Sequence, residues 1–412
     1  MPDTPPEVPP PQAPQPQALQ QPPQPPLAVP GFAWLGKNIG IKDDTPDFAV
    51  AYSRQPCAAA GVFTRNNFPG APVIVGREHL AGGRLQAIVV NSKNANVATG
   101  PDGVEDARRM CRALGAALDV APELVLPSST GVIGRRLPID RIDAACRAVR
   151  GELAEGSEAL QRFARAILTT DTRPKWVSRR VGNTTLSAVA KGAGMIEPNM
   201  ATMLAYFFTD AALDAPTLRG VLGRAVERSF NRISVDTDTS TSDTVVVLAN
   251  GQSGPVAPAS FEQAFTEAAV ELAQAIARDG EGATKLIEIT VSEAPSQAAA
   301  LAFAKAVVNS PLVKTAIHGA DPNWGRFVMA LGKVFAHPVP LEAVRIEFAT
   351  PGTPLTIAAD RQEESTLERI SAYLRGDTVA VRIRLGQGPY QETVWGCDLT
   401  EGYVRINADY TT

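Results

Sequence analysis

Apolar and polar residues follow two different periods along this chain. Short β-branched or alternating runs are typical of strands, and longer stretches with apolar residues three or four positions apart are typical of helices. The first pattern predicts strands over 48–53, 60–64, 72–76, 85–90, 185–190, 244–249, 286–292, 343–348 and 378–385. The second pattern predicts helices over 104–118, 139–153, 158–168, 215–229, 261–278 and 297–308.

Two of the predicted helices carry recognisable start signals. Pro216 stands near the beginning of its helix, where a missing backbone N–H costs little. Ser260 is the expected N-cap of the next helix, and Gln263 three residues later completes a capping box. Strands and helices are mixed without strict βαβ alternation. The expected fold class is therefore an α/β (α+β) layered sandwich and not a doubly wound nucleotide-binding fold.

Residues 1–31 differ in composition from the rest of the chain. The first 30 residues hold 13 of the 34 prolines and six glutamines, with almost no apolar anchors. Such a segment buries too little surface to offset the entropy lost on ordering. We expect a disordered Pro/Gln-rich tail over 1–31 and a globular part from residue 32 onwards.

Composition excludes several classes of protein. The chain has 412 residues, 44% of them apolar, and a net charge of −4, which offers no basic excess for nucleic acid. There is no run of 18 apolar residues and no signal-like N-terminus, so we expect a cytoplasmic protein without a membrane partner. The four cysteines lack CxxC spacing and are expected to be reduced, buried thiols. Only three histidines occur, and neither a zinc-type cluster nor a G-x-S-x-G elbow is present.

Candidate chemistry lies in segments too rich in Gly, Asn, Thr and Asp for packed scaffold. Small polar side chains and accessible N–H groups are what an active site built on loops requires. An ordinary surface loop is the alternative for each segment taken alone. The six segments are 91–100, 127–134, 191–204, 234–244, 317–326 and 407–412.

The segment 191–204 suggests a particular nucleophile. Thr202 directly precedes an apolar run, and a threonine hydroxyl needs a nearby base to become reactive. With so few histidines, that base can be the α-amino group of Thr202 itself, whose ordinary pKa of about 7.7–8 suits the task. The amine is free only if the Ala201–Thr202 peptide bond is cut. The sequence logic permits this, and a generic threonine opening a buried strand remains the alternative.

The stretch K-G-A-G-M-I-E-P-N-M-A-T-M-L resembles the self-cleavage segment of the ornithine acetyltransferase family, the bifunctional glutamate N-acetyltransferases of arginine biosynthesis. The likeness extends through N-S-K-N-A-N-V-A-T-G, S-S-T-G-V-I-G, T-T-D-T, D-T-S-T-S-D-T, G-A-D-P-N-W-G-R and N-A-D-Y-T-T. These motifs occur in order over residues 32–412. Only the proline-rich tail lies outside the resemblance.

The resemblance implies a fold like that of the DmpA-type N-terminal nucleophile hydrolases and a precursor that cuts itself. An α chain (32–201 after the tail) and a β chain (202–412) would remain one unit and assemble as pairs of αβ heterodimers, a heterotetramer. The implied reaction is ping-pong: Thr202 takes the acetyl group of N2-acetylornithine and passes it to glutamate. Acetyl-CoA serves as co-substrate in bifunctional members, and no metal or bound cofactor is implied.

The resemblance also assigns roles to particular residues. Thr130 and Gly131 match the oxyanion-hole pair, with a glycine-containing turn as the alternative. Thr170 matches a substrate-contacting position, with Thr169 as the neighbouring alternative. A cationic amino-acid substrate suits Glu281, and its carboxylate suits Lys, hydroxyl and amide donors. The complete set of implied substrate-binding residues is Thr170, Lys191, Thr202, Glu281, Asn407 and Thr412.

Departures from the family pattern leave the substrate open. Lys93 and Thr237 stand where glycine is usual in the family, and the stretch between T-T-D-T and Lys191 is shortened and rich in cations. An added ammonium at Lys93 either changes acceptor preference or sits in solvent. Three alternatives follow: a paralogue acting on another amino acid in a specialised pathway, an amidohydrolase or aminopeptidase using the same threonine, and a non-catalytic binding protein.

Overall fold

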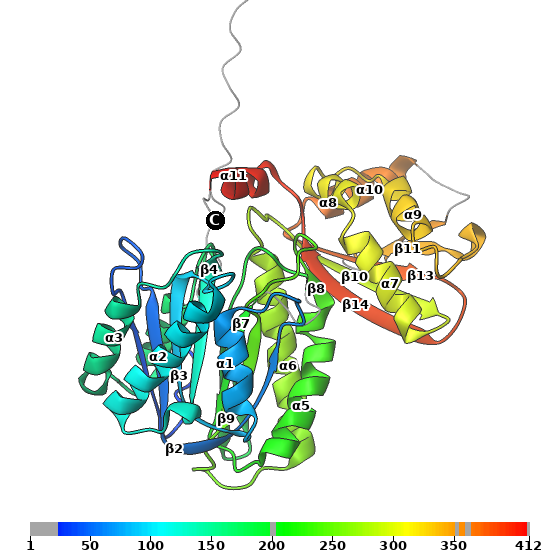
Figure 1. The fold of residues 1–412 in the computed structure, drawn as a ribbon. Helices are drawn as coiled ribbons and strands as arrows, with labels where there is room; N and C mark the ends of the chain where they lie inside the picture. The colour runs from blue at the N-terminus through cyan, green and yellow to red at the C-terminus, as the bar shows by residue number, and fades with distance from the viewer. Residues whose placement is uncertain (1–23, 198–202, 351–353, 359–363, 410–412) are drawn as a thin grey trace, which may run out of the picture.

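The computed structural model describes residues 24–197, 203–350, 354–358 and 364–409, and its larger sheet organises most of them (Figure 1). Mixed parallel and antiparallel pairing builds this sheet, and β1 (Phe32–Lys37) pairs with one half of the long strand β2 (Phe48–Phe63). From one edge to the other, the remaining order is β4 (Val125–Val132), β3 (Arg84–Asn94), β2, β9 (Thr244–Ala249), β7 (Leu204–Thr209), β6 (Thr184–Lys191) and β5 (Lys175–Val181).

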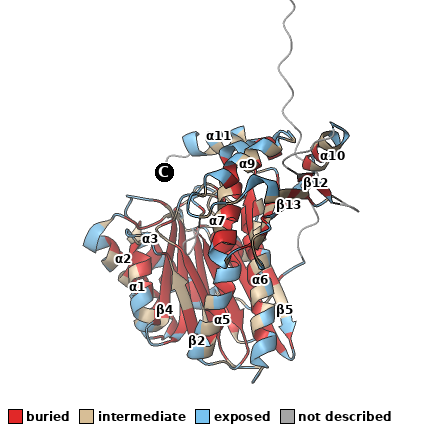
Figure 2. Cartoon of the chain, turned by 90° about the vertical axis from the view of Figure 1, so that its right-hand side faces the viewer, coloured by how far each residue is buried: buried red, intermediate tan, exposed pale blue. Residues whose placement is uncertain are grey.

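Helices cover this sheet, and their outward faces are exposed while the strands are buried (Figure 2). The apolar sides of α5 and α6 pack on strands β5, β6, β7 and β9. Helices α1, α2 and α3 pack near β3 and β4, and α4 packs on β1. The bounds are α1 (Ala71–Leu80), α2 (Gly100–Leu118), α3 (Ile139–Ala148), α4 (Ser157–Ala166), α5 (Ala215–Arg228) and α6 (Pro258–Arg278).

Strand β7 shows why a continuous apolar run forms a central strand here. Its side chains alternate between two cores, as the two-residue period of a strand requires. Tyr206 and Phe208 pack in the core that contains Phe163 of α4. Phe207 faces the other way and stacks on Phe265 of α6 with ring centroids 4.3 Å apart. Burying each phenylalanine stabilises the fold by about 1.5–3 kcal/mol, so this strand is held firmly from both sides.

A second, smaller sheet carries its own core. Its strands in order are β12 (Leu355–Ala358), β11 (Arg345–Phe348), β13 (Thr378–Arg384), β10 (Leu286–Ala294), β14 (Tyr390–Cys397) and β8 (Ile233–Ser234). Helix α7 packs on β10 and β14. The helices of this part are α7 (Gln297–Val308), α8 (Pro311–His318), α9 (Trp324–Gly332) and α10 (Glu364–Leu374), and α11 (Glu401–Asp409) follows β14. The predicted α/β layered sandwich is confirmed.

Several local predictions differ from the structure. Residues 72–76 lie in helix α1 and not in a strand, because an apolar run of this length fits either element and Pro72 suits a first helical turn. Helix α6 begins at Pro258 with Ala257 as N-cap, so Ser260 lies inside the first turn and forms no cap. Residues 127–132 of an expected loop belong to strand β4. Parts of three other expected loops also lie in regular elements: 91–94 in β3, 317–318 and 324–326 in α8 and α9, and 407–409 in α11.

The predicted tail boundary also differs. Residues 1–23 lie outside the described residues, but residues 24–31 contact the globular part. The Leu27 N–H donates to Ser178 Oγ over 2.9 Å, and Val29 is buried. These two apolar side chains give the end of the tail enough surface to dock. No single helix in the described part of the chain has both the length and the apolar character needed to cross a membrane; α7 and α8 satisfy that test only as a pair bent by 57°.

Candidate active site

The carboxyl-terminal ends of the parallel strands β3 and β4 present the predicted oxyanion pair. Ser92 pairs with Thr130, and Lys93 pairs with Gly131. Gly131 has a φ of 126°, and a Cβ at this position would stand 2.2 Å from the Lys93 carbonyl oxygen. Only glycine therefore lets the two strands approach this closely. Thr130 is buried, and its hydroxyl faces the next element of the site.

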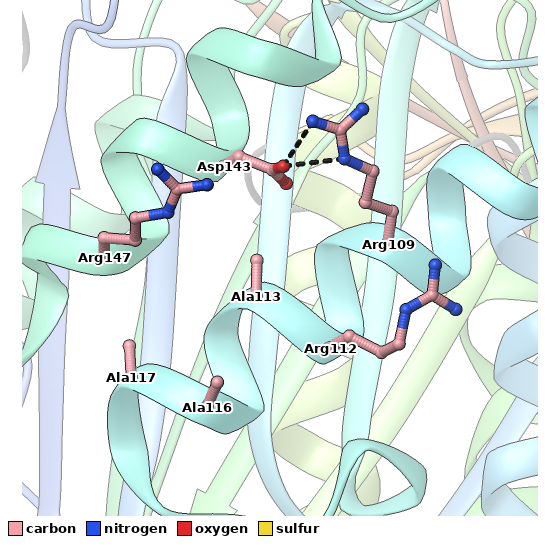
Figure 3. Close-up of a pocket in the computed structure, with 7 residues that line it drawn as sticks. All are labelled: Arg109, Arg112, Ala113, Ala116, Ala117, Asp143 and Arg147. Carbon is pink, nitrogen blue, oxygen red and sulfur yellow. Dashed lines mark hydrogen bonds and ion pairs between the residues drawn. The ribbon is translucent and has the colours of Figure 1, made fainter.

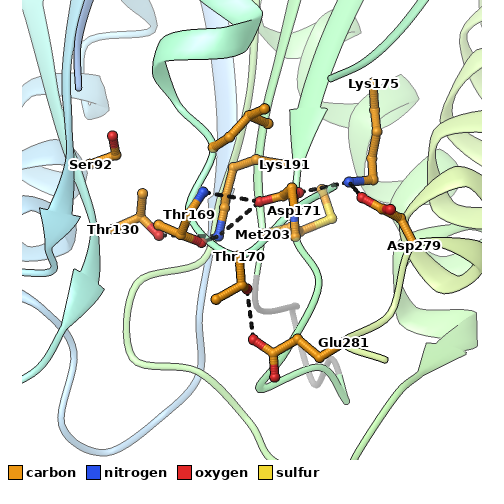
Figure 4. A network of polar contacts seen from close by, with 12 residues as sticks. Ser92, Thr130, Thr169, Thr170, Asp171, Lys175, Lys191, Met203, Asp279 and Glu281 are labelled. Atoms are coloured by element: carbon orange, nitrogen blue, oxygen red, sulfur yellow. Dashed lines mark hydrogen bonds and ion pairs between the residues drawn. The ribbon is translucent and has the colours of Figure 1, made fainter. Parts of the chain in front are cut away.

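Lys191 connects that pair to the loop after α4. It is the last residue of β6, and its ammonium donates to Thr130 Oγ1 over 3.3 Å and to Thr169 Oγ1 over 2.7 Å (Figure 4). Burial lowers the pKa of Lys191, and the charge of Asp171, 3.9 Å away, opposes that change. An ammonium in this position can receive a carboxylate or stabilise a developing negative charge.

Asp171 is the buried centre of this loop, and the sequence analysis did not single it out. Its carboxylate accepts from the Gly192 N–H over 2.6 Å and from Lys175 Nζ over 2.7 Å. Burial alone would raise its pKa, but the charges of Lys175 and Lys191 with the Gly192 N–H outweigh burial and hold the pKa below its usual range. Lys175 also donates to Asp279 over 2.5 Å, so one ammonium joins two buried carboxylates.

Glu281 hydrogen-bonds two other predicted site residues, Thr170 and Asn407. Its Oε1 accepts from the Thr170 hydroxyl over 2.6 Å, and its Oε2 accepts from the Asn407 amide over 2.9 Å. A Cβ at Gly194 would stand 2.3 Å from Glu281 Oε2, so any larger residue at this position would displace the carboxylate from its present place. Asn407 lies on α11, which crosses above the end of β4 in Figure 1. The carboxylate can hold a substrate ammonium.

The structure thus brings together Thr130, Lys191 and Thr169 in one set of contacts, and Thr170, Glu281 and Asn407 in another. Both neighbouring threonines are used: Thr169 faces Lys191, and Thr170 faces Glu281. Thr202 and Thr412 lie outside the described residues. The roles of all these residues stay predictions. Among the described residues no group of three or more His, Cys, Asp or Glu side chains is arranged to hold a metal ion.

A surface groove between α2 and α3 lies apart from these contacts (Figure 3). None of the predicted site residues lines it. Arg109 donates to Asp143 over 2.6 Å and to Asp140 over 2.7 Å, so its charge is already paired. The groove is lined by Arg109, Arg112, Ala113, Ala116, Ala117, Asp143 and Arg147.

Comparison with known proteins identifies the family. The model of the ArgJ family matches residues 33–412. The chain belongs to the ArgJ family. The resemblance inferred from the sequence motifs is therefore confirmed, over everything but the N-terminal tail.

Several relatives align over nearly their whole length. The chain is 47% identical to arginine biosynthesis bifunctional protein ArgJ 2 of Clostridium acetobutylicum, over 92% of this chain and 97% of that protein. It is 46% identical to glutamate N-acetyltransferase Oat2 of Streptomyces clavuligerus, over 93% and 98% respectively. A crystal structure of ArgJ from Bacillus halodurans matches with 42% identity and a TM-score of 0.45, over 49% of this chain and 96% of that chain.

Proposed function

We propose that this protein is a self-processing glutamate N-acetyltransferase of arginine biosynthesis that acts in the cytoplasm. The observation that carries the proposal is the convergence of Lys191, Glu281 and their partners from separate segments, in a chain whose relatives bear that activity in their names. An ammonium and a carboxylate, each flanked by hydroxyl groups, are complementary to an α-amino acid. The donor is N2-acetylornithine, with acetyl-CoA as a second donor, and glutamate is the acceptor.

Self-processing comes first in this proposal. The Thr202 hydroxyl oxygen adds to the Ala201 carbonyl carbon, the C–N bond breaks, and the released amine takes the hydroxyl proton. Water then hydrolyses the ester, which leaves a free Thr202 hydroxyl and an Ala201 carboxylate. The pairing of β6 with β7, from Leu186 opposite Thr209 to Lys191 opposite Leu204, supports a product in which both chains stay associated.

Acetyl transfer follows by the same hydroxyl. The Thr202 hydroxyl attacks the acetyl carbonyl of acetylornithine while its own α-amine takes the hydroxyl proton. The C–N bond of the donor then breaks, that proton passes to the departing ornithine amine, and an acetyl-threonine ester remains. The amine of glutamate then attacks the ester and restores the hydroxyl. Donors from Thr130 and Gly131 would stabilise the oxyanion of both steps, each worth about 10²–10³ in rate. Lys191 would bind the substrate carboxylate, and Glu281 with Thr170 and Asn407 would bind its cationic group.

Intact mass and N-terminal sequencing of the purified protein test the processing step. We expect two chains, one of them beginning at Thr202, and paired αβ units by light scattering. Thr202→Ala should give one uncut chain, whereas the matched variant Thr217→Ala on α5 should process normally. A single full-length chain for the wild type, or a different new N-terminus, would contradict the proposal and favour a binding protein.

Substrate assays separate transfer from hydrolysis. The processed protein is incubated with acetylornithine, with and without glutamate. Formation of acetylglutamate when glutamate is added supports the transferase. Acetate release that ignores glutamate would support an amidohydrolase instead, and transfer to a different amino acid would indicate a paralogue in a specialised pathway.

A further inference from the structure

Asp243 has a buried carboxyl that lies beside the start of β7 in space, and none of the predicted roles includes it. It directly precedes β9, and β9 runs parallel to β7 with Leu204 opposite Thr244. Its Oδ1 accepts a hydrogen bond from the backbone N–H of Met203 over 2.9 Å. The backbone of Asp243 is fixed in turn, because its carbonyl oxygen accepts from the Thr64 N–H over 3.0 Å. This carboxyl therefore belongs to the sheet and not to a loose loop.

Met203 is hydrogen-bonded at both of its backbone polar groups, the N–H and the carbonyl oxygen. Its N–H is held by the side chain of Asp243, and its carbonyl oxygen accepts from the Thr244 N–H over 3.0 Å. The N–H of residue 203 belongs to the peptide group that residue 202 begins. Because that group is planar, a hydrogen bond to the Met203 N–H also restricts the preceding α-carbon.

The second oxygen of Asp243 makes the arrangement unusual. The residue is 2% exposed, and its Oδ2 makes no hydrogen bond of ordinary length to the described residues. The hydroxyls of Thr64 and Ser240 nevertheless lie close enough to the carboxyl to lower its pKa. A buried, unsatisfied carboxyl oxygen costs about 1–3 kcal/mol. A fold keeps such a group where another requirement holds it there. An aspartate at the other end of β7 has no such deficit: Asp210 accepts from the Thr185 N–H and from Ser253 Oγ.

We infer that Asp243 is a positioning residue for the reaction proposed above. By holding the Met203 amide, it fixes the peptide group through which the nucleophilic residue enters β7, and so orients that residue for self-cleavage and acetyl transfer. The inference rests on the proposed function, because it needs Thr202 as nucleophile. Its own content is the hydrogen bond to Met203, which is independent of how the substrate is bound.

Two variants of Asp243 test the hydrogen bond separately from the charge. Asp243→Ala removes the acceptor, and we expect self-cleavage and kcat for acetyl transfer to fall at least about tenfold, with the KM for acetylornithine unchanged in the processed fraction. Asp243→Asn keeps a carbonyl oxygen at Oδ1 and should restore both rates to within about threefold of wild type. Cleavage is followed on denaturing gels, and folding is checked by circular dichroism.

Asp210→Ala is the matched control, since it removes an equally buried aspartate from the other end of the same strand. It should lower thermal stability and leave the cleavage rate of the folded protein unchanged. The inference is overturned if Asp243→Ala cleaves at the wild-type rate, if Asp243→Asn is as slow as Asp243→Ala, or if Asp210→Ala is slowed equally. A wild-type chain that never cleaves before Thr202 would instead remove the proposed function, and this inference with it.

Discussion

The Thr170 hydroxyl donates a 2.6 Å hydrogen bond to Glu281 although the two residues are 111 positions apart. The predicted break at Ala201–Thr202 falls between them, so this contact would join the two chains of the processed protein. Lys175 and Asp279 make a second contact across the same break. The proposed site is therefore complete only while both chains remain folded together.

Glu281→Gln tests the proposed ammonium site. The amide keeps the size of the side chain but removes its negative charge, and hydrogen bonds to charged groups contribute about 1.5–3 kcal/mol. We expect the KM for acetylornithine to rise at least about tenfold, with a smaller change in kcat and normal processing. Steady-state kinetics measure both constants. Glu271→Gln, at an exposed glutamate of α6 paired with Arg179, is the control and should leave KM unchanged.

An unchanged KM in Glu281→Gln would show that this carboxylate does not contact the substrate. Loss of processing in the same variant would assign Glu281 to self-cleavage instead. Either result would contradict the proposed ammonium site, and the hydrogen bond between Thr170 and Glu281 would then serve only the stability of the fold.

Lys175→Met tests the buried ion pairs that hold the site loop. Removing the ammonium leaves the Asp171 and Asp279 carboxylates buried without their shared cation, which costs about 3–5 kcal/mol. Thermal and denaturant unfolding in a Thr202→Ala background, where one uncut chain is expected, measure the change. Arg179→Met breaks an exposed pair and should cost no more than about 1 kcal/mol. Equal losses in the two variants would contradict the buried-pair interpretation.

Lys93→Gly tests a strained backbone beside the predicted oxyanion pair. Lys93 has a φ of 90°, a conformation that costs a non-glycine residue about 1–3 kcal/mol. Glycine relieves that strain and loses about 0.4–1 kcal/mol through its freer unfolded chain. We expect a net gain of about 1 kcal/mol in the free energy of unfolding. Arg84→Gly, at the start of the same strand, should instead lose about 0.5–1 kcal/mol.

The same variant decides between the two interpretations of the Lys93 ammonium. A changed ratio of kcat/KM between glutamate and other acceptors would place the charge in acceptor selection. An unchanged ratio would leave it in solvent. A lower stability of Lys93→Gly would contradict the strain argument in either case.

The sequence predicted the family and the layered architecture because both depend on patterns that extend over the whole chain. It also indicated Lys93 and Thr237 as departures from glycine, and both have positive φ in the structure, at 90° and 71°. Thr237 is the more surprising of the two, since a β-branched residue rarely adopts this conformation. The usual glycine at these two positions indicated a positive φ, which the pattern of apolar and polar residues does not reveal.

Other features could not be predicted because they depend on contacts between distant segments. The polar stretch 127–134 looks like a loop, yet residues up to Val132 form β4, where hydroxyl groups are buried beside β3. Lys175 looks like a surface cation of a charged stretch, and its role appears only when Asp279 folds against it. In the sequence, Asp243 is one more polar residue before an apolar strand. Its hydrogen bond with Met203, 40 positions away, is visible only in the structure.

Asp243→Asn also tests the electrostatics of the same buried group through pH. Burial raises the pKa of Asp243 well above its ordinary value, although the Met203 N–H, the hydroxyls of Thr64 and Ser240 and the charge of Lys191 oppose the rise. The folded state then binds more protons than the unfolded state above about pH 4, so this group makes stability fall as pH increases through that window. The asparagine variant has no such proton. We expect it to match the wild type near pH 4 and to be the more stable protein at neutral pH.

Denaturant unfolding of both proteins in the Thr202→Ala background between about pH 4 and pH 8 measures this difference. Groups distant from Asp243 cancel when the two curves are subtracted, so the remaining slope belongs to this carboxyl. Asp210→Asn serves as the reference, because its carboxylate accepts hydrogen bonds at both oxygens and loses them on substitution. A difference between Asp243→Asn and wild type that stays constant with pH would show that the carboxyl is ionised in the fold throughout, and would contradict the raised pKa.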